Sequence, residues 1–450
     1  MKKLFGTDGI RGEAGKFPLD ETTVEAIGES LARRLREQIG ALPKIVIGRD
    51  TRESGPWIEA ALIAGARRVD AEVKSAGIIT TPGVAFLART LPADAGVVIS
   101  ASHNPYNDNG IKIFAPSGRK LDDAMERRIE EDIGNRVLIS SERTRNSESE
   151  SAELDLHSRY LNYLAAEIGH DLSLAKFTIV VDCANGAAFQ IAPELFALLG
   201  ARVIAINDKP NGRNINHNCG SLHIEGLQKR VVAERADLGV AFDGDADRAL
   251  FVDVAGEFVD GDATMWVLAN NLKSHEELTG NTVVATVMSN LGLEIALLSK
   301  GIKLRRTDVG DKYVLEELIR SGAALGGEQS GHIIFPKLSL AGDGLITTIA
   351  VLRVMRDKNK SLAQLKLGMQ QYPQLLVNVR VREKRPFDDM PVVRDLAREI
   401  EDRLGTQGRL LLRYSGTEPL ARVMIEGKSK EMIQAQAEQL VKTIKAELGT

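Results

Sequence analysis

Cysteine, aromatic residues and long apolar runs are all scarce in this chain of 450 residues. Its only cysteines are Cys183 and Cys219, too few for a disulfide framework or a cysteine-rich zinc site, which favours a reducing compartment. No apolar stretch approaches the roughly 18 residues that a membrane helix needs. The chain is nonetheless 43% hydrophobic, so it can bury several cores, and its length allows more than one domain.

A large excess of charge of one sign is also missing. The chain has 58 Lys and Arg against 62 Asp and Glu, which excludes a chain-wide basic field for nucleic acid or an anionic membrane but leaves room for a local anion pocket. Met1–Lys3 could begin a signal peptide, but Asp8, Arg11 and Glu13 interrupt any apolar segment behind it. We expect a soluble, cytoplasmic protein with no nucleic-acid or membrane partner.

One pattern, a β-branched strand, a helix, a strand, a helix and a third strand, occurs three times. The expected strands cover residues 44–50, 71–73 and 95–99, then 177–182, 201–205 and 238–242, then 282–286, 302–304 and 323–326. Strands that alternate with helices predict three tandem α/β domains with similar mixed, mainly parallel sheets.

The pattern changes beyond about residue 370. A strand near 375–381, a helix over 388–404, strands flanking 413–419 and a helix over 428–448 predict a smaller α+β domain. The Ser/Glu/Arg-rich stretch Ser140–Ser151 is the clearest linker candidate. The expected domains are residues 1–152, 153–254, 255–369 and 370–450.

Unusual polar residues follow the third strand of each repeat. The three segments are Ser100–Pro105, Asp243–Arg248 and Gly327–His332. Open α/β sheets bind ligands beyond the carboxyl ends of their strands, so we expect the three loops to converge on one cleft. The alternative is three independent loops that never meet.

Three aspartates, Asp243, Asp245 and Asp247, alternate in the second of these loops. Carboxylates this close repel one another unless a cation lies among them, and oxygen ligands without His or Cys favour Mg²⁺ over zinc. A calcium EF-hand is excluded, because Arg and Val stand where that motif has Gly and Glu. An acidic turn capping a helix is the structural alternative. A second Asp-Gly-Asp, at 260–262, lacks the third carboxylate and is interpreted as a turn and helix start.

The first loop, Ser-Ala-Ser-His-Asn-Pro, offers a nucleophile. Ser102 could attack phosphorus or carry a phosphoryl group. The adjacent His103 need not be its base, since neighbouring side chains commonly diverge, and Ser100 is a plausible decoy. No G-x-S-x-G elbow supports an esterase. A Ser-rich loop is usually only a turn, and its occurrence with a Mg²⁺-type loop is what favours catalysis.

Further anion-binding and sugar-binding groups stand in other loops. Residues 413–419, Arg-Tyr-Ser-Gly-Thr-Glu-Pro, combine a guanidinium, hydroxyls and a glycine into a phosphate cradle, or form an ordinary hairpin turn. Glu328 and Ser330 can bond vicinal hydroxyls, and His332 can exchange protons near neutral pH, although a lone histidine is more often structural. Arg11 leaves a glycine-rich segment that is either a phosphate clamp or a tight turn.

Together these motifs resemble the α-D-phosphohexomutase family. The four matching motifs occur in order at residues 100–105, 243–248, 327–332 and 413–419. With residues 5–12 in front, the resemblance spans essentially the whole chain, and the motifs are highly specific as a set. It implies four domains around a central cleft, the fourth closing over the substrate phosphate.

The resemblance also implies roles for individual residues. Ser102 would be a phosphoserine in the active enzyme, and one Mg²⁺ would bridge that phosphate and the three aspartates. Charge stabilisation or proton transfer would fall to Arg11, Lys112, Arg248 and His332. Substrate binding would fall to Gly310, Glu328, Gln329, Ser330, Arg413, Ser415, Gly416, Thr417 and Arg422. A homodimer is a further expectation from the family.

The implied reaction moves a phosphoryl group between two oxygens of one sugar. Phospho-Ser102 would donate to O1, and the resulting 1,6-bisphosphate would turn over and return its 6-phosphate. Glucosamine 1,6-bisphosphate or a related hexose bisphosphate would prime the enzyme. Gln329 and the segment Asp108–Lys112 resemble the glucosamine branch of the family. That implies interconversion of glucosamine 6-phosphate and glucosamine 1-phosphate, on the route to UDP-N-acetylglucosamine and cell-wall precursors.

Three other hypotheses stay open on the sequence. The first is a phosphoglucomutase/phosphomannomutase with the same mechanism. The second is a haloacid-dehalogenase-type phosphatase with Asp243 as nucleophile, although that family expects Thr or Val in place of Asp247. The third is a sugar-phosphate-binding regulator, which would need neither Ser102 nor a dication.

Overall fold

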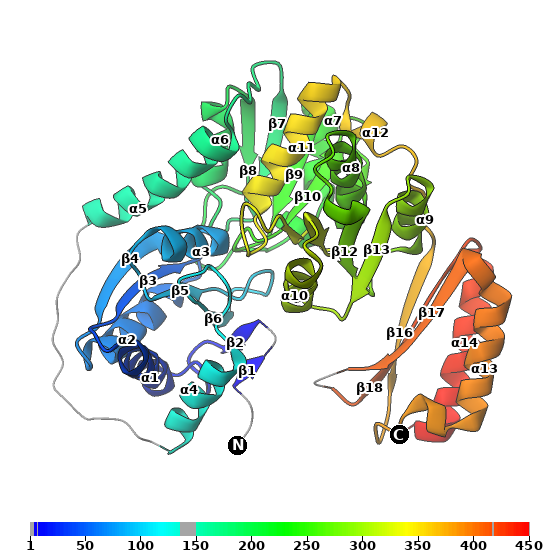
Figure 1. The fold of residues 1–450 in the computed structure, drawn as a ribbon, viewed down its shortest axis with the longest axis horizontal. Helices are drawn as coiled ribbons and strands as arrows, with labels where there is room; N and C mark the ends of the chain where they lie inside the picture. The colour runs from blue at the N-terminus through cyan, green and yellow to red at the C-terminus, as the bar shows by residue number, and fades with distance from the viewer. Residues whose placement is uncertain (1–3, 7, 136–149, 416–417, 450) are drawn as a thin grey trace. The chain divides into compact units, whose positions relative to one another are not determined.

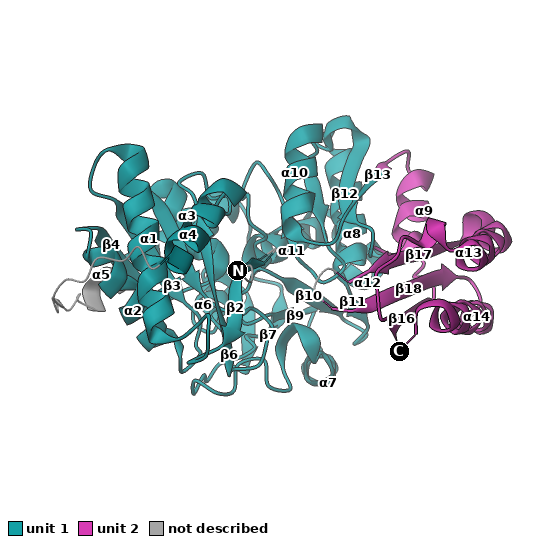
Figure 2. Ribbon diagram, turned by 90° about the horizontal axis from the view of Figure 1, so that it is seen from below, with its two compact units in different colours: residues 1–288, 304–366 teal, residues 289–303, 367–450 magenta. Residues whose placement is uncertain are grey.

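The computed structural model describes residues 4–6, 8–135, 150–415 and 418–449. They form two compact units (Figures 1 and 2), the first made of residues 1–288 and 304–366 and the second of residues 289–303 and 367–450. Most of the expected linker at 140–151 lies outside the described residues. Among the described helices, none combines the length and apolar character needed to traverse a bilayer.

The first sheet of unit 1 has six strands. Their order is β1 (Phe5–Gly6), β2 (Gly9–Glu13), β6 (Asp108–Phe114), β5 (Ala95–Ile99), β3 (Lys44–Arg49) and β4 (Glu72–Ile78). Strand β3 is parallel to β4 and β5, whereas β6 and β2 are antiparallel to their neighbours. Its helices are α1 (Glu21–Ile39), α2 (Gly55–Arg67), α3 (Thr81–Thr90) and α4 (Asp123–Asn135).

Helices α1 and α2 pack unusually close together. A Cβ on Gly28 would lie 2.2 Å from the Leu62 carbonyl oxygen, and one on Gly65 would lie 1.9 Å from that of Glu25. Only glycine permits such an approach of two helix backbones. These two helices cover one side of the first sheet, while α3 contacts β3 and β5 from its own side (Figure 1).

The second and third sheets of unit 1 repeat the arrangement. The second has the order β11 (Phe258–Val259), β10 (Ala249–Asp253), β9 (Leu238–Phe242), β7 (Thr178–Asp182), β8 (Arg202–Ile206). The third has the order β13 (Lys303–Thr307), β12 (Thr282–Thr286), β14 (Leu325–Gly327), β15 (Ile333–Ile334). The accompanying helices are α5 (Glu150–Asn162), α6 (Ile191–Leu198), α7 (Glu225–Glu234), α8 (Gly261–Ser274), α10 (Asp311–Ser321), α11 (Gly344–Lys358) and α12 (Leu362–Leu365).

Each predicted three-strand pattern is present, and each ends in an antiparallel strand that the pattern did not include. The chain passes from β5 through the serine loop into β6, from β9 through the aspartate loop into β10, and from β14 through the third loop into β15. All five residues of β5 and of β9 are buried, as expected for strands covered on both faces. The motif loops are therefore hairpin tips on buried strands, which gives them a firm base.

Unit 2 contains an antiparallel sheet of the order β16 (Gln374–Arg380), β18 (Leu420–Gly427), β17 (Gly408–Tyr414). Helices α13 (Pro391–Leu404) and α14 (Lys430–Leu448) pack on it, and α9 (Leu291–Ser299) also belongs to this unit. The core lies between sheet and helices and includes Val379, Val423, Ile400 and Leu440. The α+β prediction for this part of the chain is confirmed.

Candidate active site

The hydroxyl of Ser102 lies against the aspartate loop. Its Oγ donates a hydrogen bond to Asp243 Oδ2 at 2.5 Å, although 141 positions separate the two residues. Ser102 is 1% exposed and has a φ of 53°, a left-handed conformation that costs a side-chain-bearing residue about 1–3 kcal/mol. His103 Nδ1 is 3.3 Å from the same Oγ. The first two motif loops thus meet, as expected.

His103 is poorly suited to carry charge here. Burial, reinforced by Arg248 and Arg11, lowers the pKa of its imidazole to about 4. The ring is therefore neutral near pH 7 and can accept or donate a hydrogen bond at Ser102 without adding charge.

The three aspartates of the second loop form one buried cluster. A ligand atom from each of Asp243, Asp245 and Asp247 lies within 4.8 Å of the others. Asp245 Oδ1 and Asp247 Oδ1 are buried and lack a hydrogen-bond partner among the described residues. Burial and the two other carboxylates raise the pKa of Asp243 well above its usual value. Orphaned hard oxygens that repel one another fit a divalent cation such as Mg²⁺.

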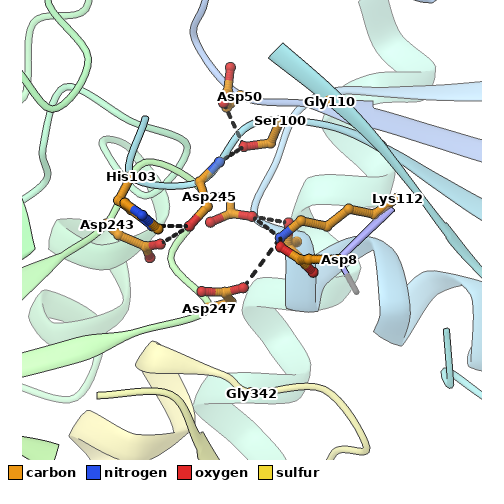
Figure 3. A network of polar contacts seen from close by, with 12 residues as sticks. Asp8, Asp50, Ser100, His103, Gly110, Lys112, Asp243, Asp245, Asp247 and Gly342 are labelled. Carbon is orange, nitrogen blue, oxygen red and sulfur yellow. Dashed lines mark hydrogen bonds and ion pairs between the residues drawn. The ribbon is translucent and has the colours of Figure 1, made fainter. Parts of the chain in front are cut away.

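Lys112, on β6, brings a buried positive charge to this cluster (Figure 3). Its Nζ lies 2.9 Å from Asp245 Oδ2, 3.4 Å from Asp247 Oδ2 and 3.3 Å from Asp8 Oδ2. Burial by itself would lower the pKa of the ammonium, but Asp245, Asp8 and Asp247 raise it well above its usual value. Lys112 is therefore a permanent cation in the arrangement shown.

Asp8 connects Lys112 with two further cations. Arg11 donates a hydrogen bond to Asp8, and Lys120 Nζ lies 2.5 Å from Asp8 Oδ1 and 2.6 Å from Asp311 Oδ2. Burial alone would raise the pKa of Asp8, but Lys112, Lys120 and Arg11 lower it well below its usual value. The sequence analysis did not identify Asp8, Lys120 or Asp311. Only Asp8 gave a signal, since it stands in the same glycine-rich segment as Arg11.

Arg248, the last residue of the aspartate loop, contacts Asp243, the first residue of that loop. Its backbone N–H donates to Asp243 Oδ1 at 3.2 Å, and its Nε lies 3.7 Å from Asp247 Oδ1. Although burial opposes its charge, Asp247 and Asp243 raise the pKa of the guanidinium. The buried Nε has no hydrogen-bond partner among the described residues. Arg248 therefore keeps donor capacity beside the cluster.

His332, from the third loop, is the only described histidine with an ion-pair contact to one of the three aspartates. Its Nδ1 is 3.6 Å from Asp247 Oδ1, and the Gly342 N–H donates to its Nε2 at 3.2 Å. Burial by itself would lower the pKa of His332, but Asp247 and Asp311 raise it to about 9. The Gly342 donor acts in the opposite sense, because it favours a neutral ring that carries its proton on Nδ1.

The third loop also gathers four of the expected substrate-binding residues, Gly310, Glu328, Gln329 and Ser330. Glu328 Oε1 accepts a hydrogen bond from the Gly310 N–H at 3.2 Å, which brings these two together. Gln329 Nε2 lies 3.3 Å from Asp260 Oδ2. The side chains of Glu328, Gln329 and Ser330 are half-buried, so each can also reach a ligand.

The Asp-Gly-Asp segment at 260–262 has a larger part than the predicted turn and helix start. Asp260 does cap α8 by accepting from the Ala263 N–H. In addition, the Gly261 N–H donates to the Gln329 carbonyl at 2.9 Å, and a Cβ on Gly261 would lie 2.1 Å from the Glu328 carbonyl oxygen. Only glycine allows this contact, so the segment is the base on which the third loop rests.

The fourth motif lies in unit 2, at the turn between β17 and β18. Arg413 and Arg422 are Cα partners across the strand pair, so both side chains leave the same face of the sheet. Arg422 Nη2 lies 3.4 Å from Ser415 Oγ, and Lys384 Nζ donates to the Ser415 carbonyl at 2.6 Å. The expected Gly416 and Thr417 lie outside the described residues. The three cations fit an anion such as phosphate.

A cavity of about 360 Å³ opens in unit 1 beside the charged groups. It is lined by Lys112, Asp247 and His332 and by apolar side chains that include Phe114 and Leu315. Charged and polar side chains are the majority of those that line it, and a concave site where such groups converge is a candidate small-molecule pocket. The convergence of all three loops of unit 1 on one site is confirmed.

Three α/β sheets whose hairpin tips unite a serine, a carboxylate triad and buried cations define a class of protein, the phosphohexomutases. Four domain families match the chain in order: Phosphoglucomutase/phosphomannomutase alpha/beta/alpha domains I, II and III over residues 2–137, 158–256 and 260–372, and the C-terminal domain over residues 376–443. The chain belongs to the phosphoglucomutase/phosphomannomutase family. It is an enzyme of the isomerase type that transfers a phosphoryl group.

Relatives in sequence are named more narrowly. A phosphoglucosamine mutase of Solibacter usitatus is 50% identical over 448 residues, which cover 100% of this chain and 99% of the relative. One of Acetivibrio thermocellus is 48% identical and is covered completely, as is this chain. Among solved structures, a phosphoglucomutase/phosphomannomutase family protein of Burkholderia thailandensis has a TM-score of 0.81 at 24% identity, with 99% and 98% of the two chains covered.

A more distant solved structure comes from Aspergillus fumigatus. It is an N-acetylphosphoglucosamine mutase in complex with GlcNAc-6P and magnesium, with a TM-score of 0.69 at 20% identity, covering 99% of this chain and 96% of that one. At this identity the likeness shows a common fold.

Proposed function

We propose that this enzyme is a phosphoglucosamine mutase that interconverts glucosamine 6-phosphate and glucosamine 1-phosphate. The observation that carries the mechanism is the 2.5 Å contact between Ser102 Oγ and Asp243 Oδ2 inside the carboxylate triad. The name of the relatives at 46–50% identity over nearly the full chain supports the amino-sugar substrate. Gln329 in the third loop also supports it. A homodimer and a cytoplasmic location stay predictions.

The proposed cycle starts from phospho-Ser102. The P–Oγ bond breaks as a P–O1 bond forms to the sugar, a proton leaves O1 and one is taken up by Ser102 Oγ, and a 1,6-bisphosphate results. After the intermediate turns over, its P–O6 bond breaks as the P–Oγ bond re-forms, Oγ gives up its proton, O6 takes one up, and glucosamine 1-phosphate leaves. In a loose phosphoryl-transfer transition state, catalysis is mostly positioning and neutralisation of charge. Lys112, Arg248 and Arg11 are the cations available to do this.

Asp243, Asp245 and Asp247 would hold the Mg²⁺ of the active enzyme. Bound there, the ion would neutralise charge on the phosphoryl oxygens. The chain's own contribution is to keep three carboxylates and Ser102 within reach of one another before substrate arrives. Thr81 assists by donating its hydroxyl to Asp245 Oδ2 at 2.6 Å.

We further propose that the non-reacting phosphate is held by Arg413, Ser415 and Arg422, together with Gly416 and Thr417. The like-charged Arg413 and Arg422 on neighbouring strands support this assignment, because an anion bound between them would relieve their repulsion. The domains proposed from the sequence, residues 1–152, 153–254, 255–369 and 370–450, place one motif loop in each.

Two measurements test the proposal. Ser102→Ala should lower kcat by at least ~10⁴-fold while the protein stays folded, since the variant has no oxygen to carry the phosphoryl group. The ratio of kcat/KM for glucosamine phosphate over glucose and mannose phosphates, with Mg²⁺ and a hexose bisphosphate primer, tests the substrate. Comparable kcat/KM values for the three sugar phosphates would keep the mechanism and reassign the enzyme as a phosphoglucomutase/phosphomannomutase.

The comparisons with known proteins argue against the phosphatase and regulator hypotheses. The match of all four domain families places the chain in a different family from the haloacid-dehalogenase-type phosphatases. A phosphoenzyme that resists hydroxylamine would agree, because an acyl phosphate on Asp243 would be cleaved. Turnover by the wild type would exclude a regulator that only binds sugar phosphates.

A further inference from the structure

Arg52 is the largest fully buried side chain among the described residues. It follows β3 and points its guanidinium at the backbone of the serine loop. One terminal nitrogen, Nη2, donates to the Ser102 carbonyl at 3.0 Å and to the Asn104 carbonyl at 2.9 Å, and the other, Nη1, donates to the Pro105 carbonyl. No motif of the sequence analysis includes this residue.

Asp50 binds both Arg52 and a serine of the same loop. Its Oδ2 accepts from Arg52 Nε at 2.9 Å and from Ser100 Oγ at 2.6 Å, and its Oδ1 accepts from the Arg52 N–H at 2.9 Å. Ser100 Oγ in turn accepts from the Ser102 N–H at 2.9 Å. The backbone of Ser102 is therefore held at both its N–H and its C=O by one buried network.

The serine loop requires such a restraint on its backbone. Ser102 has a left-handed φ of 53°, and a side-chain-bearing residue keeps that conformation only where its surroundings enforce it. The proposed reaction requires the Ser102 oxygen to stay in line with a sugar oxygen, and a misplacement of about 1 Å can cost ~100-fold in rate.

We propose that Arg52, paired with Asp50, is a positioning residue for the nucleophile. It acts through the backbone of residues 102–105 and touches neither the aspartate triad nor the lining of the 360 Å³ cavity. A guanidinium suits the task because its planar fork donates several hydrogen bonds in fixed directions, whereas an ammonium is a point charge. This inference rests on the proposed function, in which Ser102 carries the phosphoryl group.

The test compares Arg52→Lys with Arg49→Lys. Arg52→Lys keeps the charge beside Asp50 but cannot donate to three carbonyls at once, so we expect kcat to fall ~100-fold with KM changed less than ~3-fold. Transfer of phosphate from glucose 1,6-bisphosphate to Ser102, followed by intact mass, should slow by a similar factor. Arg49 on the same β3 pairs with Glu59 at 2.8 Å and donates nothing to the serine loop, so its variant should keep wild-type rates.

Ser100→Ala provides a second, smaller change. It removes the acceptor of the Ser102 N–H and leaves Arg52 in place, so we expect kcat to fall ~10-fold with KM unchanged. If Arg52→Lys does not fold, this variant decides. Wild-type kcat in a folded Arg52→Lys or, failing that, in Ser100→Ala overturns the inference, as does a change confined to KM.

Failure of the inference and failure of the proposed function are distinguishable. A fully active Ser102→Ala would overturn the proposed function itself. An inactive Ser102→Ala combined with fully active Arg52→Lys and Ser100→Ala would overturn only the positioning role.

Discussion

Two regions of this enzyme gather cations, and they differ in how many carboxylates surround those cations. In unit 1, Lys112 has three carboxylates within 3.4 Å, so its charge is compensated before any ligand binds. In unit 2, Arg413 and Arg422 stand as partners on adjacent strands, and Lys384 donates to the carbonyl of nearby Ser415. Lys112 thus pairs with three carboxylates, whereas Arg422 pairs with the more exposed Glu418 at 3.5 Å.

The difference suits the two roles proposed for these regions, which are transfer of a phosphoryl group and binding of the non-reacting phosphate. A group that takes part in transfer must be held at fixed geometry in every step, and opposing charges provide that rigidity. A group that grips a non-reacting phosphate must release it when the intermediate turns over. Like charges across a strand pair are destabilising, so an anion bound between Arg413 and Arg422 would relieve their repulsion. Glu418, 3.5 Å from Arg422, competes with that anion and would ease its release.

The largest expected effect comes from breaking the compensated region. Lys112→Met leaves three carboxylates without their buried cation, so we expect a loss of about 3–5 kcal/mol in unfolding free energy and a fall in kcat of at least ~10³-fold. The measurements are thermal unfolding and steady-state kinetics. Lys74→Met is the control, because Lys74 pairs with Glu72 at 3.5 Å on an exposed surface. Equal melting temperatures for the two variants would contradict the prediction.

Asp343 is a buried carboxylate with no cation beside it among the described residues, so it can be compared with the carboxylates around Lys112. Asp343 caps α11 and accepts from Tyr160 Oη at 2.6 Å, and burial, opposed by these hydrogen bonds, raises its pKa to about 6. Since the folded pKa exceeds the unfolded value, the folded state binds more protons between about pH 4 and 6. The stability that this provides is full below pH 4 and is lost as the pH rises through 6.

Asp343→Asn should therefore remove about 3 kcal/mol of pH dependence, at 1.36 kcal/mol per pKa unit. Relative to wild type, the variant becomes more stable as the pH rises from 4.5 to 7.5, and its amide can still cap α11. The measurement is the difference in melting temperature between variant and wild type at several pH values. A difference that does not change with pH would rule out the raised pKa.

Removal of the metal separates repulsion from binding in the aspartate triad. Mg²⁺ at 100 times its Kd should stabilise the wild type by about 2.7 kcal/mol over the protein in EDTA. Asp243→Asn should respond less to Mg²⁺, lose activity, and melt above the wild type in EDTA, because one of three repelling carboxylates is gone. The same Mg²⁺ shift in both proteins would place the ion elsewhere.

The smallest effect is expected at Arg422 in unit 2. Arg422→Gln removes one of two facing guanidinium groups, so we expect KM to rise ~10–30-fold while unfolding free energy changes by less than about 1 kcal/mol. Arg403→Gln, on the exposed surface of α13 beside Glu399, is the matched control and should change neither. A strong loss of stability in Arg422→Gln would show that both regions are built alike.

Much of the fold and half of the site could be predicted from the sequence. The nine strands of the three repeats are present, and the fully buried ones, such as β5 and β9, are continuous apolar runs that are visible in one dimension. Ser102, Asp243 and His332 were found because they follow such strands and because their motifs form a recognisable set.

Other residues of the site gave little or no signal. Lys120 binds both Asp8 and Asp311, which stand 112 and 191 positions away. Polar residues whose partners are other polar residues follow no periodicity. Arg52 and Asp50 do follow a strand, β3, at the same edge of the sheet as Ser102. Their position was a usable signal, but nothing in their identity showed that a guanidinium would turn toward a neighbouring loop.

The sequence by itself determined the three α/β repeats, the α+β end of the chain and the chemistry of each motif loop, because strand burial and loop composition are local properties. Tertiary structure alone decided which loops meet, which carboxylates are left for a cation, and which buried charges compensate Lys112. These outcomes depend on distances of a few ångströms between residues that stand more than a hundred positions apart. Coulombic and hydrogen-bond energies fall off steeply over such distances, and no linear pattern encodes them.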